Sequence, residues 1–159
     1  MVYIYFILLL SFGLVVLIGA PYLPTLKKQQ NKALEILELK QGQTVLDLGC
    51  GDGRFLLAAA KCGYKAVGIE ANPLLVIVAY FVTIKYRKTV SVKWGNIWVG
   101  DWPQTDAIYV FLHTRFMKKL DKKLSQKYNG NKIKVVSFAF EIPDKKIKKN
   151  VDGLFLYEY

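Results

Sequence analysis

The fold of this chain is decided by the stretch Val45-Leu46-Asp47-Leu48-Gly49-Cys50-Gly51-Asp52-Gly53-Arg54-Phe55. A short apolar run ends at Leu48, and three glycines at alternate positions follow it. A glycine-rich turn between a strand and a helix lets a ligand approach the backbone closely at the N-terminus of the helix. The segment therefore predicts the first strand, the ligand-binding turn and the first helix of a parallel α/β sheet.

The residues around this turn narrow the class of ligand. Counting from Gly49, the sixth position is Arg54, so the dinucleotide pattern G-x-G-x-x-G/A fails, and no Gly-Lys-Ser/Thr follows as in a P-loop. Asp47 and Asp52 flank the turn and would repel a pyrophosphate. A ligand that is positively charged here and carries no phosphate fits better, and S-adenosylmethionine has both properties.

A second acidic residue supports this interpretation. Glu70 ends the second expected strand, 21 positions after Gly49 (70 − 49), close to the spacing of roughly 20 residues in nucleoside-binding units. A carboxylate at that place can accept hydrogen bonds from ribose hydroxyls. The glycine turn and the acid together are much more specific than either of them alone.

Strand and helix patterns alternate along the rest of the chain. We expect helices over 26–39, 53–62, 74–87 and 115–128, and strands over 44–48, 66–70, 90–94, 106–112, 132–142 and 153–159. Such alternation is typical of βαβ units, so the predicted fold class is α/β, a Rossmann-like, doubly wound and mostly parallel sheet.

The N-terminus predicts a membrane anchor. Residues 1–20 contain no charged side chain, the first being Lys27, and roughly 20 apolar residues cross a bilayer. A cleaved signal peptide is the alternative, but nothing basic precedes the apolar run. Because Lys27, Lys28 and Lys32 follow it, we expect a single-pass membrane protein. Its domain, residues 21–159, would face the cytoplasm, or the matrix if the protein is mitochondrial.

Composition and charge limit which partners and metal sites the chain can have. The chain has 159 residues, 53% of them hydrophobic, a mean hydropathy of +0.22 and a net charge of +11. From Arg115 to Lys149 there are 12 basic and 3 acidic residues, which predicts either a solvated face or a surface on anionic lipid, with nucleic acid unlikely. Cys50 and Cys62 are too few for a zinc site, so no metal is expected.

One helix has an unusual pattern. Residues 74–84 are apolar on every side, and the segment is too short to span a bilayer. A buried position is one explanation. The other, which we favour as a hypothesis, is that its outer face rests on the bilayer or on the anchor helix.

With these motifs in place, residues 45–113 resemble the class I S-adenosylmethionine-dependent methyltransferases. The resemblance implies S-adenosyl-L-methionine as the cofactor and assigns the cofactor-binding residues by motif. The turn contributes Asp47, Gly49, Cys50, Gly51, Asp52 and Gly53; the second strand end contributes Glu70 and Ala71; the adenine side contributes Asn96 and Ile97.

A narrower resemblance covers nearly the whole chain. The segments 21–25, 109–114 and 136–142 follow the apolar anchor in the order seen in small protein-lysine methyltransferases. These include mitochondrial membrane-anchored enzymes that modify an ATP synthase subunit and an adenine nucleotide carrier, and a short archaeal enzyme. The resemblance makes Thr25 a contact to the cofactor carboxylate and implies a lysine-bearing protein substrate, for which an integral membrane protein is a sensible choice.

The residues that would receive the substrate are less well defined. Phe111, Thr114, Phe140 and Glu141 are candidates for a substrate channel, although ordinary sheet core explains Phe111, Thr114 and Phe140 at least as well. No catalytic residue is assigned: Glu141, Asp106 and His113 are candidates for a base, and a structural role is the simpler explanation for His113. Two alternatives to protein-lysine methylation stay open, namely methylation of a lipophilic small molecule such as a quinone or lipid, and a non-catalytic, membrane-bound basic module.

Overall fold

The computed structural model describes residues 27–128 and 132–159. The expected membrane anchor, residues 1–20, and Thr25 lie outside the described residues. The described helices are α2 (Lys27–Leu37), α3 (Arg54–Lys61), α4 (Pro73–Thr83) and α5 (Met117–Lys127), with 3₁₀ turns η1 (Ile84–Tyr86) and η2 (Thr114–Phe116). The strands are β1 (Thr44–Leu48), β2 (Lys65–Glu70), β3 (Val90–Trp94), β4 (Ala107–Val110), β5 (Lys134–Phe138), β6 (Lys149–Val151) and β7 (Leu154–Glu158).

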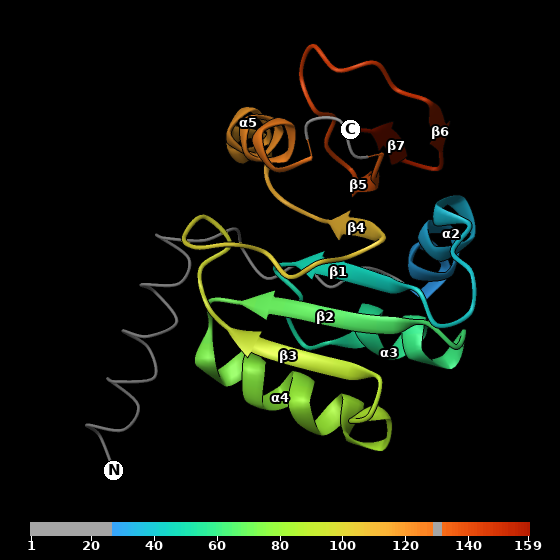
Figure 1. The fold of residues 1–159 in the computed structure, drawn as a ribbon, viewed down its shortest axis with the longest axis vertical. Coiled ribbons are helices and arrows are strands. Elements are labelled where there is room, and N and C mark those ends of the chain that lie inside the picture. The colour runs from blue at the N-terminus through green and yellow to red at the C-terminus, as the bar shows by residue number, and fades with distance from the viewer. Residues whose placement is uncertain (1–26, 129–131) are drawn as a thin grey trace.

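The described strands form one sheet in the order β3-β2-β1-β4-β5-β7-β6 (Figure 1). The pairs β3-β2, β2-β1, β1-β4 and β4-β5 are parallel, whereas β7 runs antiparallel to both β5 and β6. The predicted fold class, an α/β and mostly parallel Rossmann-like sheet, is therefore confirmed. Because β1 and β4 are neighbours although the chain visits β2 and β3 between them, the strand order reverses beside β1. A ligand crevice is expected at such a switch point.

Alternate side chains of the strands point to opposite faces of the sheet, and each face has its own apolar core. On one face, α2 and α3 cover Val45 and Tyr109, and the Phe55 ring stacks on the Tyr109 ring with centroids 4.0 Å apart. On the other face, α5 covers Leu46 and Ile108. The sheet is therefore wound on both sides, as the sequence predicted.

Helix α4 begins as expected but does not bury its apolar residues. The side chain of Asn72 accepts a hydrogen bond from Leu74 N (2.9 Å), and Pro73 occupies the first turn. Only Ala79 and Thr83 of α4 are buried, and Thr83 Oγ1 donates to Ala79 O at 2.7 Å. The buried position that the sequence allowed for this helix is therefore wrong, because its apolar side chains outnumber the places available against α3 and β3.

The strand β6 was not predicted from the sequence; it has three residues and a run of lysines before it. It forms a hairpin with β7 through Asp152 and Gly153, whose φ angles are +52° and +77°. An Asp-Gly pair with positive φ angles is a preferred hairpin turn, so the signal was present in the sequence. Lys32 of α2 forms an ion pair with Asp152 at 3.0 Å and ties the hairpin to that helix.

Within residues 27–128 and 132–159, none of the helices has the length and apolar character needed to cross a bilayer.

Candidate functional site

The carboxyl ends of the parallel strands meet at one edge of the sheet, and the glycine turn lies there. The amides of Gly49 and Cys50 donate to Ile69 O at 2.9 and 3.2 Å, which fastens the turn after β1 to the last part of β2. Gly49 itself is exposed and has a φ of +88°. The backbone of the turn is therefore open to a ligand at the switch point of the sheet.

Glu70 organises this edge. Its Oε2 accepts from Gly51 N at 2.9 Å and its Oε1 accepts from Asn72 N at 2.8 Å. A carboxylate has about four lone-pair sites, so two remain after these bonds. The side chain is half-buried, and its orientation is set before any ligand arrives. Glu70 can therefore still accept the ribose hydroxyls that the sequence assigned to it.

Gly53 is the point where the turn meets α4. Its φ is +79°, and a Cβ at this position would lie 2.8 Å from Ala79 Cβ and 3.0 Å from Ala79 Cα. Glycine is required here for both reasons, the left-handed backbone and the close approach of the helix. The turn is consequently held between α4 and the start of α3.

The acidic residues at the turn differ in how well their charges are compensated. Asp47 is fully buried, and its pKa is raised well above the usual value, first by burial and then by the charges of Glu70 and Asp52. All three causes raise the pKa, so a nearby cation would relieve this carboxyl. Asp52 is already paired: Arg54 Nε lies 2.9 Å from each of its oxygens. This pair was not predicted, although Arg54 stands only two positions from Asp52 in the sequence.

Together, Gly49, Glu70 and Asp47 fit S-adenosylmethionine, which the sequence predicted as the ligand. The open backbone at Gly49 and the remaining lone pairs of Glu70 suit a nucleoside. The uncompensated Asp47 suits a positively charged sulfur or amine, whereas a pyrophosphate would add to the repulsion.

Cys50, also assigned to the cofactor turn, points into the core. Its thiol is buried, and burial, followed by the charge of Asp47, raises its pKa. A Cβ on Gly68 of β2 would lie 2.5 Å from Cys50 Sγ, so the thiol occupies space that only a glycine leaves free. The side chain thus packs beneath the turn, and the Cys50 amide and carbonyl are bonded to Ile69 O and Gly53 N, so Cys50 supports the turn as a whole.

The other residues predicted to bind the cofactor, Ala71 at the second strand end and Asn96 and Ile97 on the adenine side, follow β2 and β3. Ala71 and Asn96 are exposed, and Ile97 is buried. Asn96 Oδ1 accepts from Trp98 N at 2.9 Å, which shapes the loop and leaves the amide nitrogen for other contacts. Trp94, which no sequence motif singled out, donates from Nε1 to Ala71 O at 3.0 Å and so links the ends of β2 and β3.

The predicted channel residues fall into two groups. Phe111 and Phe140 come together with Phe138, since the Phe111 ring lies 4.9 Å from that of Phe138 and 6.3 Å from that of Phe140. The ring of His113 lies 5.5 Å from Phe140. Thr114 and Glu141 are exposed beside them. An aromatic cluster therefore stands after β4 and β5, at the same edge of the sheet as the glycine turn.

Two of the three candidate bases have structural partners. Asp106 accepts from Thr44 N at 2.7 Å and from Gln43 Nε2 at 3.3 Å, just before β4 begins. It lies at the amino edge of the sheet, the end opposite the glycine turn, so the suggestion that Asp106 acts as a base is wrong. His113 Nδ1 accepts from Arg115 N at 3.3 Å and caps η2, which agrees with the structural role.

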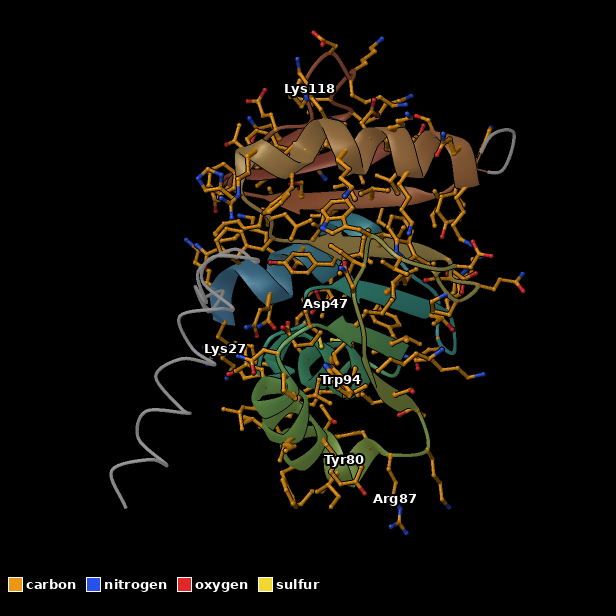
Figure 2. All side chains as sticks on the ribbon, turned by 90° about the vertical axis from the view of Figure 1, so that its left-hand side faces the viewer. Lys27, Asp47, Tyr80, Arg87, Trp94 and Lys118 are labelled. Atoms are coloured by element: carbon orange, nitrogen blue, oxygen red, sulfur yellow. The ribbon has the colours of Figure 1, made fainter. Side chains whose placement is uncertain are left out.

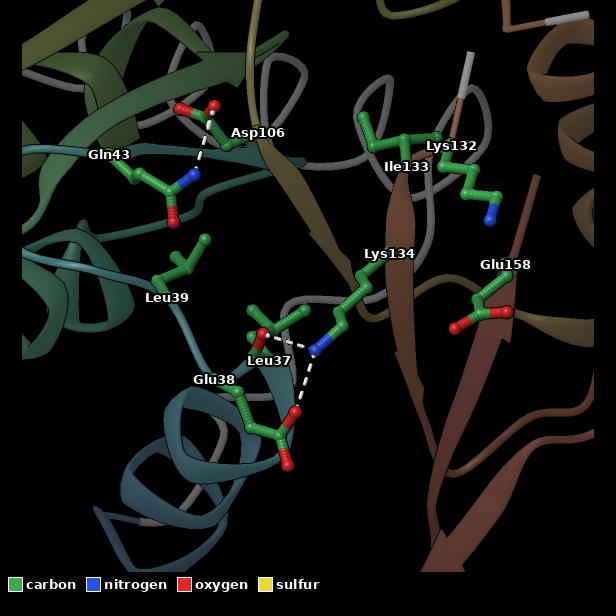
Figure 3. Close-up of a pocket in the computed structure, with 9 residues that line it drawn as sticks. All are labelled: Leu37, Glu38, Leu39, Gln43, Asp106, Lys132, Ile133, Lys134 and Glu158. Carbon is green, nitrogen blue, oxygen red and sulfur yellow. Dashed lines mark hydrogen bonds and ion pairs between the residues drawn. The ribbon is translucent and has the colours of Figure 1, made fainter. Parts of the chain in front are cut away.

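A hollow of about 250 Å³ opens at that same amino edge (Figure 3). Its walls include Gln43, Asp106 and Lys134, and the Lys134 ammonium pairs with Glu38 at 2.8 Å. These residues precede or begin β1, β4 and β5, whereas the glycine turn follows β1. The hollow is therefore separate from the candidate site and adds nothing to it.

Several of the clustered lysines are engaged within the fold. Lys119 lies over the ring of Trp98 and Lys123 over that of Trp102, at 4.7 and 4.9 Å. Lys123 also donates to Ile97 O and Gly100 O at 2.9 Å. These lysines hold the loop between β3 and β4 against α5, so part of the basic surface has a structural use.

Comparisons with known proteins agree with this geometry. The sequence profile of the ANTKMT methyltransferase domain matches residues 47–149, more than half of the chain. A protein-lysine N-methyltransferase of Saccharolobus islandicus (strain REY15A) is 36% identical over 126 residues, which is 77% of this chain and 78% of that protein. The ATP synthase C-subunit lysine N-methyltransferase of Rattus norvegicus is 29% identical over 143 residues, 87% of this chain and 66% of that protein.

A solved structure shows the same architecture. An RNA methyltransferase from Salinibacter ruber in complex with S-adenosyl-L-homocysteine has a TM-score of 0.76 and 25% identity, and the match covers 86% of this chain and 92% of that one. The chain spans less than two thirds of the mammalian relatives, 66% in rat, 61% in human and 58% in mouse. The profile match and the archaeal relative together show that the chain belongs to the ANTKMT methyltransferase domain family.

Proposed function

We propose that this chain is an S-adenosylmethionine-dependent methyltransferase that modifies lysine side chains of proteins. The observation that carries the proposal is the likeness to the archaeal protein-lysine N-methyltransferase, 36% identical with 78% of that protein covered. Three structural features independently support S-adenosylmethionine as the cofactor. They are the exposed turn at Gly49, the Glu70 carboxylate oriented by two hydrogen bonds, and the buried Asp47 whose charge is uncompensated.

Three residues would bind different parts of the cofactor. Glu70 would accept the ribose hydroxyls, the Gly49 backbone would lie against the nucleoside, and Asp47 would face the positive end of the cofactor. S-adenosylmethionine supplies a methyl group on a sulfonium that is already an activated leaving group. The remaining task of the protein is to place the acceptor within about 3–3.5 Å of that methyl carbon and in line with it.

A lysine acceptor must arrive without its proton. The ordinary pKa of a lysine side chain in water is about 10.4, and an apolar surround lowers it. The cluster of Phe111, Phe138 and Phe140 supplies such a surround beside the site. Its rings would remove water from the lysine, so the chain needs no strong base of its own.

We further propose that residues 1–20 tether this domain to a membrane, with the domain on the cytoplasmic side or in the matrix. Support comes from the uncharged apolar run and the lysines that follow it. A tether raises the local concentration of membrane-bound targets without any added contact. The lysine substrate would then be a protein in or near that membrane.

The direct test uses the purified chain with membranes and S-adenosylmethionine labelled at the methyl group. We expect label in protein, and mass spectrometry should find Lys residues heavier by one to three methyl groups. Glu70→Ala is the matched inactive control. Label recovered in extractable lipid or in RNA would contradict lysine as the acceptor, and label in neither fraction would contradict the transferase itself.

Cofactor binding should release a proton from Asp47. Since burial and neighbouring acids raise its pKa in the free protein, this carboxyl holds a proton above the ordinary carboxyl range. A bound cation favours the ionised form, so affinity should rise with pH, by at most about tenfold per pH unit, and level off above the raised pKa. Calorimetry in buffers of different ionisation enthalpy measures the proton directly. Asp47→Asn should remove the pH dependence, and an unchanged slope in that variant would contradict the assignment.

A further inference from the structure

The outer side of α4 is an exposed apolar surface, here named the α4 face, made of Leu74, Ile77, Val78, Tyr80, Phe81 and Val82. Phe81 is 64% exposed and Ile77 and Tyr80 are each 53% exposed. Single exposed apolar side chains are normal on a protein surface, but six on one short helix are not. Such a patch indicates a partner.

The stretch of sequence that contains α4 carries charges of one sign only. From residue 71 to residue 100 the sequence contains no acidic residue, and its basic residues are Lys85, Arg87, Lys88 and Lys93. All four are exposed, three of them directly after α4 and one on the neighbouring edge strand β3. Figure 2 shows Tyr80 and Arg87 at the same end of the molecule, with Lys118 of α5 at the other end.

The aromatic residues of this end have the character of an interface belt. Tyr80 and Phe81 stand side by side on the α4 face. Tyrosine favours the boundary between water and hydrocarbon because it has an apolar ring and a polar atom. Apolar, aromatic and basic side chains thus occur on one surface.

We infer that the α4 face lies on a lipid bilayer with anionic headgroups. The helix has 11 residues and a length of about 16 Å, so it lies along the surface and does not cross the membrane. Apolar side chains enter the boundary of the acyl chains, and the basic residues at its end meet the lipid phosphates. This inference goes beyond the proposed function, since it requires neither methyl transfer nor the span of residues 1–20.

Other occupants fit the charges less well. A second copy of the chain, packed face to face, would cover the apolar side chains but would bring only further basic residues from the segment 71–100. Residues 1–26 carry no charged side chain, so they would match the apolar side chains and leave the basic residues without a counterpart. An anionic lipid surface offers acyl chains to the apolar side chains and phosphates to the basic residues.

The test places a fluorophore at one position of the full chain. Cys62→Ser removes the exposed thiol, while the Cys50 thiol is buried. Val78→Cys then labels the α4 face, and Lys118→Cys labels α5 as the matched control. In vesicles of equal parts phosphatidylcholine and phosphatidylglycerol, lipids brominated on the acyl chains should quench the label at position 78 and leave the label at position 118 unchanged.

A second variant tests the charges. Replacing Lys85, Arg87 and Lys88 by Gln should lower the ratio of docked to undocked domain by roughly a hundredfold, because each basic residue near such a surface contributes about 1 kcal/mol. Thermal unfolding checks that the exposed substitutions leave the fold intact. Quenching at position 118 in place of 78 would assign the bilayer to α5, and no quenching at 78 would mean that another chain segment or copy covers it; either result overturns the inference. Methylation is not part of the readout, so a failure here leaves the proposed function untouched.

Discussion

Glu70→Ala is expected to weaken S-adenosylmethionine binding by at least about a hundredfold. Each hydrogen bond from a ribose hydroxyl to a charged acceptor contributes about 1.5–3 kcal/mol, and 1.4 kcal/mol corresponds to a factor of ten in affinity. The variant also frees the amides of Gly51 and Asn72, which Glu70 holds at 2.9 and 2.8 Å. Isothermal calorimetry with S-adenosylmethionine or S-adenosylhomocysteine measures the loss.

The control for this prediction is Glu35→Ala, which removes an exposed carboxylate from α2 and should leave affinity unchanged. Glu70→Gln keeps the length of the side chain and separates the loss of charge from the loss of support for the turn. An affinity of Glu70→Ala within about threefold of the parent would contradict the placement of the ribose, since even one such bond exceeds that change.

Gly53→Ala is expected to lower the free energy of unfolding by about 2–5 kcal/mol. A left-handed backbone costs a residue with a Cβ about 1–2 kcal/mol, and overpacking costs a further 1–3 kcal/mol. The new Cβ would meet Ala79 Cβ at 2.8 Å and its Cα at 3.0 Å, and the backbone of α4 cannot rotate away as a flexible side chain can. Urea unfolding measures the change.

Gly42 offers a matched control. Its φ is also +79°, but a Cβ there would meet nothing within 4 Å. Gly42→Ala should therefore show the backbone contribution alone, about 1–2 kcal/mol. Equal losses of stability in the two variants would mean that the close approach of α4 to the turn has no energetic weight, contrary to the role assigned to Gly53.

The sequence predicted those features whose causes are local. The alternation of strands and helices, the glycine turn after Leu48 and the cap at Asn72 depend on residues within a few positions of one another. The parallel sheet followed from them, because α/β alternation allows few topologies. Glu70 could be assigned since the spacing to Gly49 reflects one βαβ unit.

Features that depend on residues far apart in the chain could not be predicted from the sequence. Asp106 stood at the start of an expected strand, and only the pairing of β1 with β4 shows that its carboxylate binds Thr44 at the amino edge. The strand β6 is too short to show a period, and it exists because β7 lies beside it. For α4, an apolar pattern on every side is the same for a buried and for an exposed helix, so periodicity had nothing to decide between them.

Helix α4 buries only Ala79 and Thr83 completely, Leu75 and Val76 are partly buried, and its remaining side chains are exposed. This division makes the helix a convenient place for engineering. Polar replacements at Ile77, Val78 and Phe81 should raise the solubility of the protein in detergent-free buffer during crystallisation. All three side chains are exposed and none belongs to the buried core. The same replacements would leave Ala79 in place against Gly53, so the nucleoside turn would keep its shape in the engineered protein.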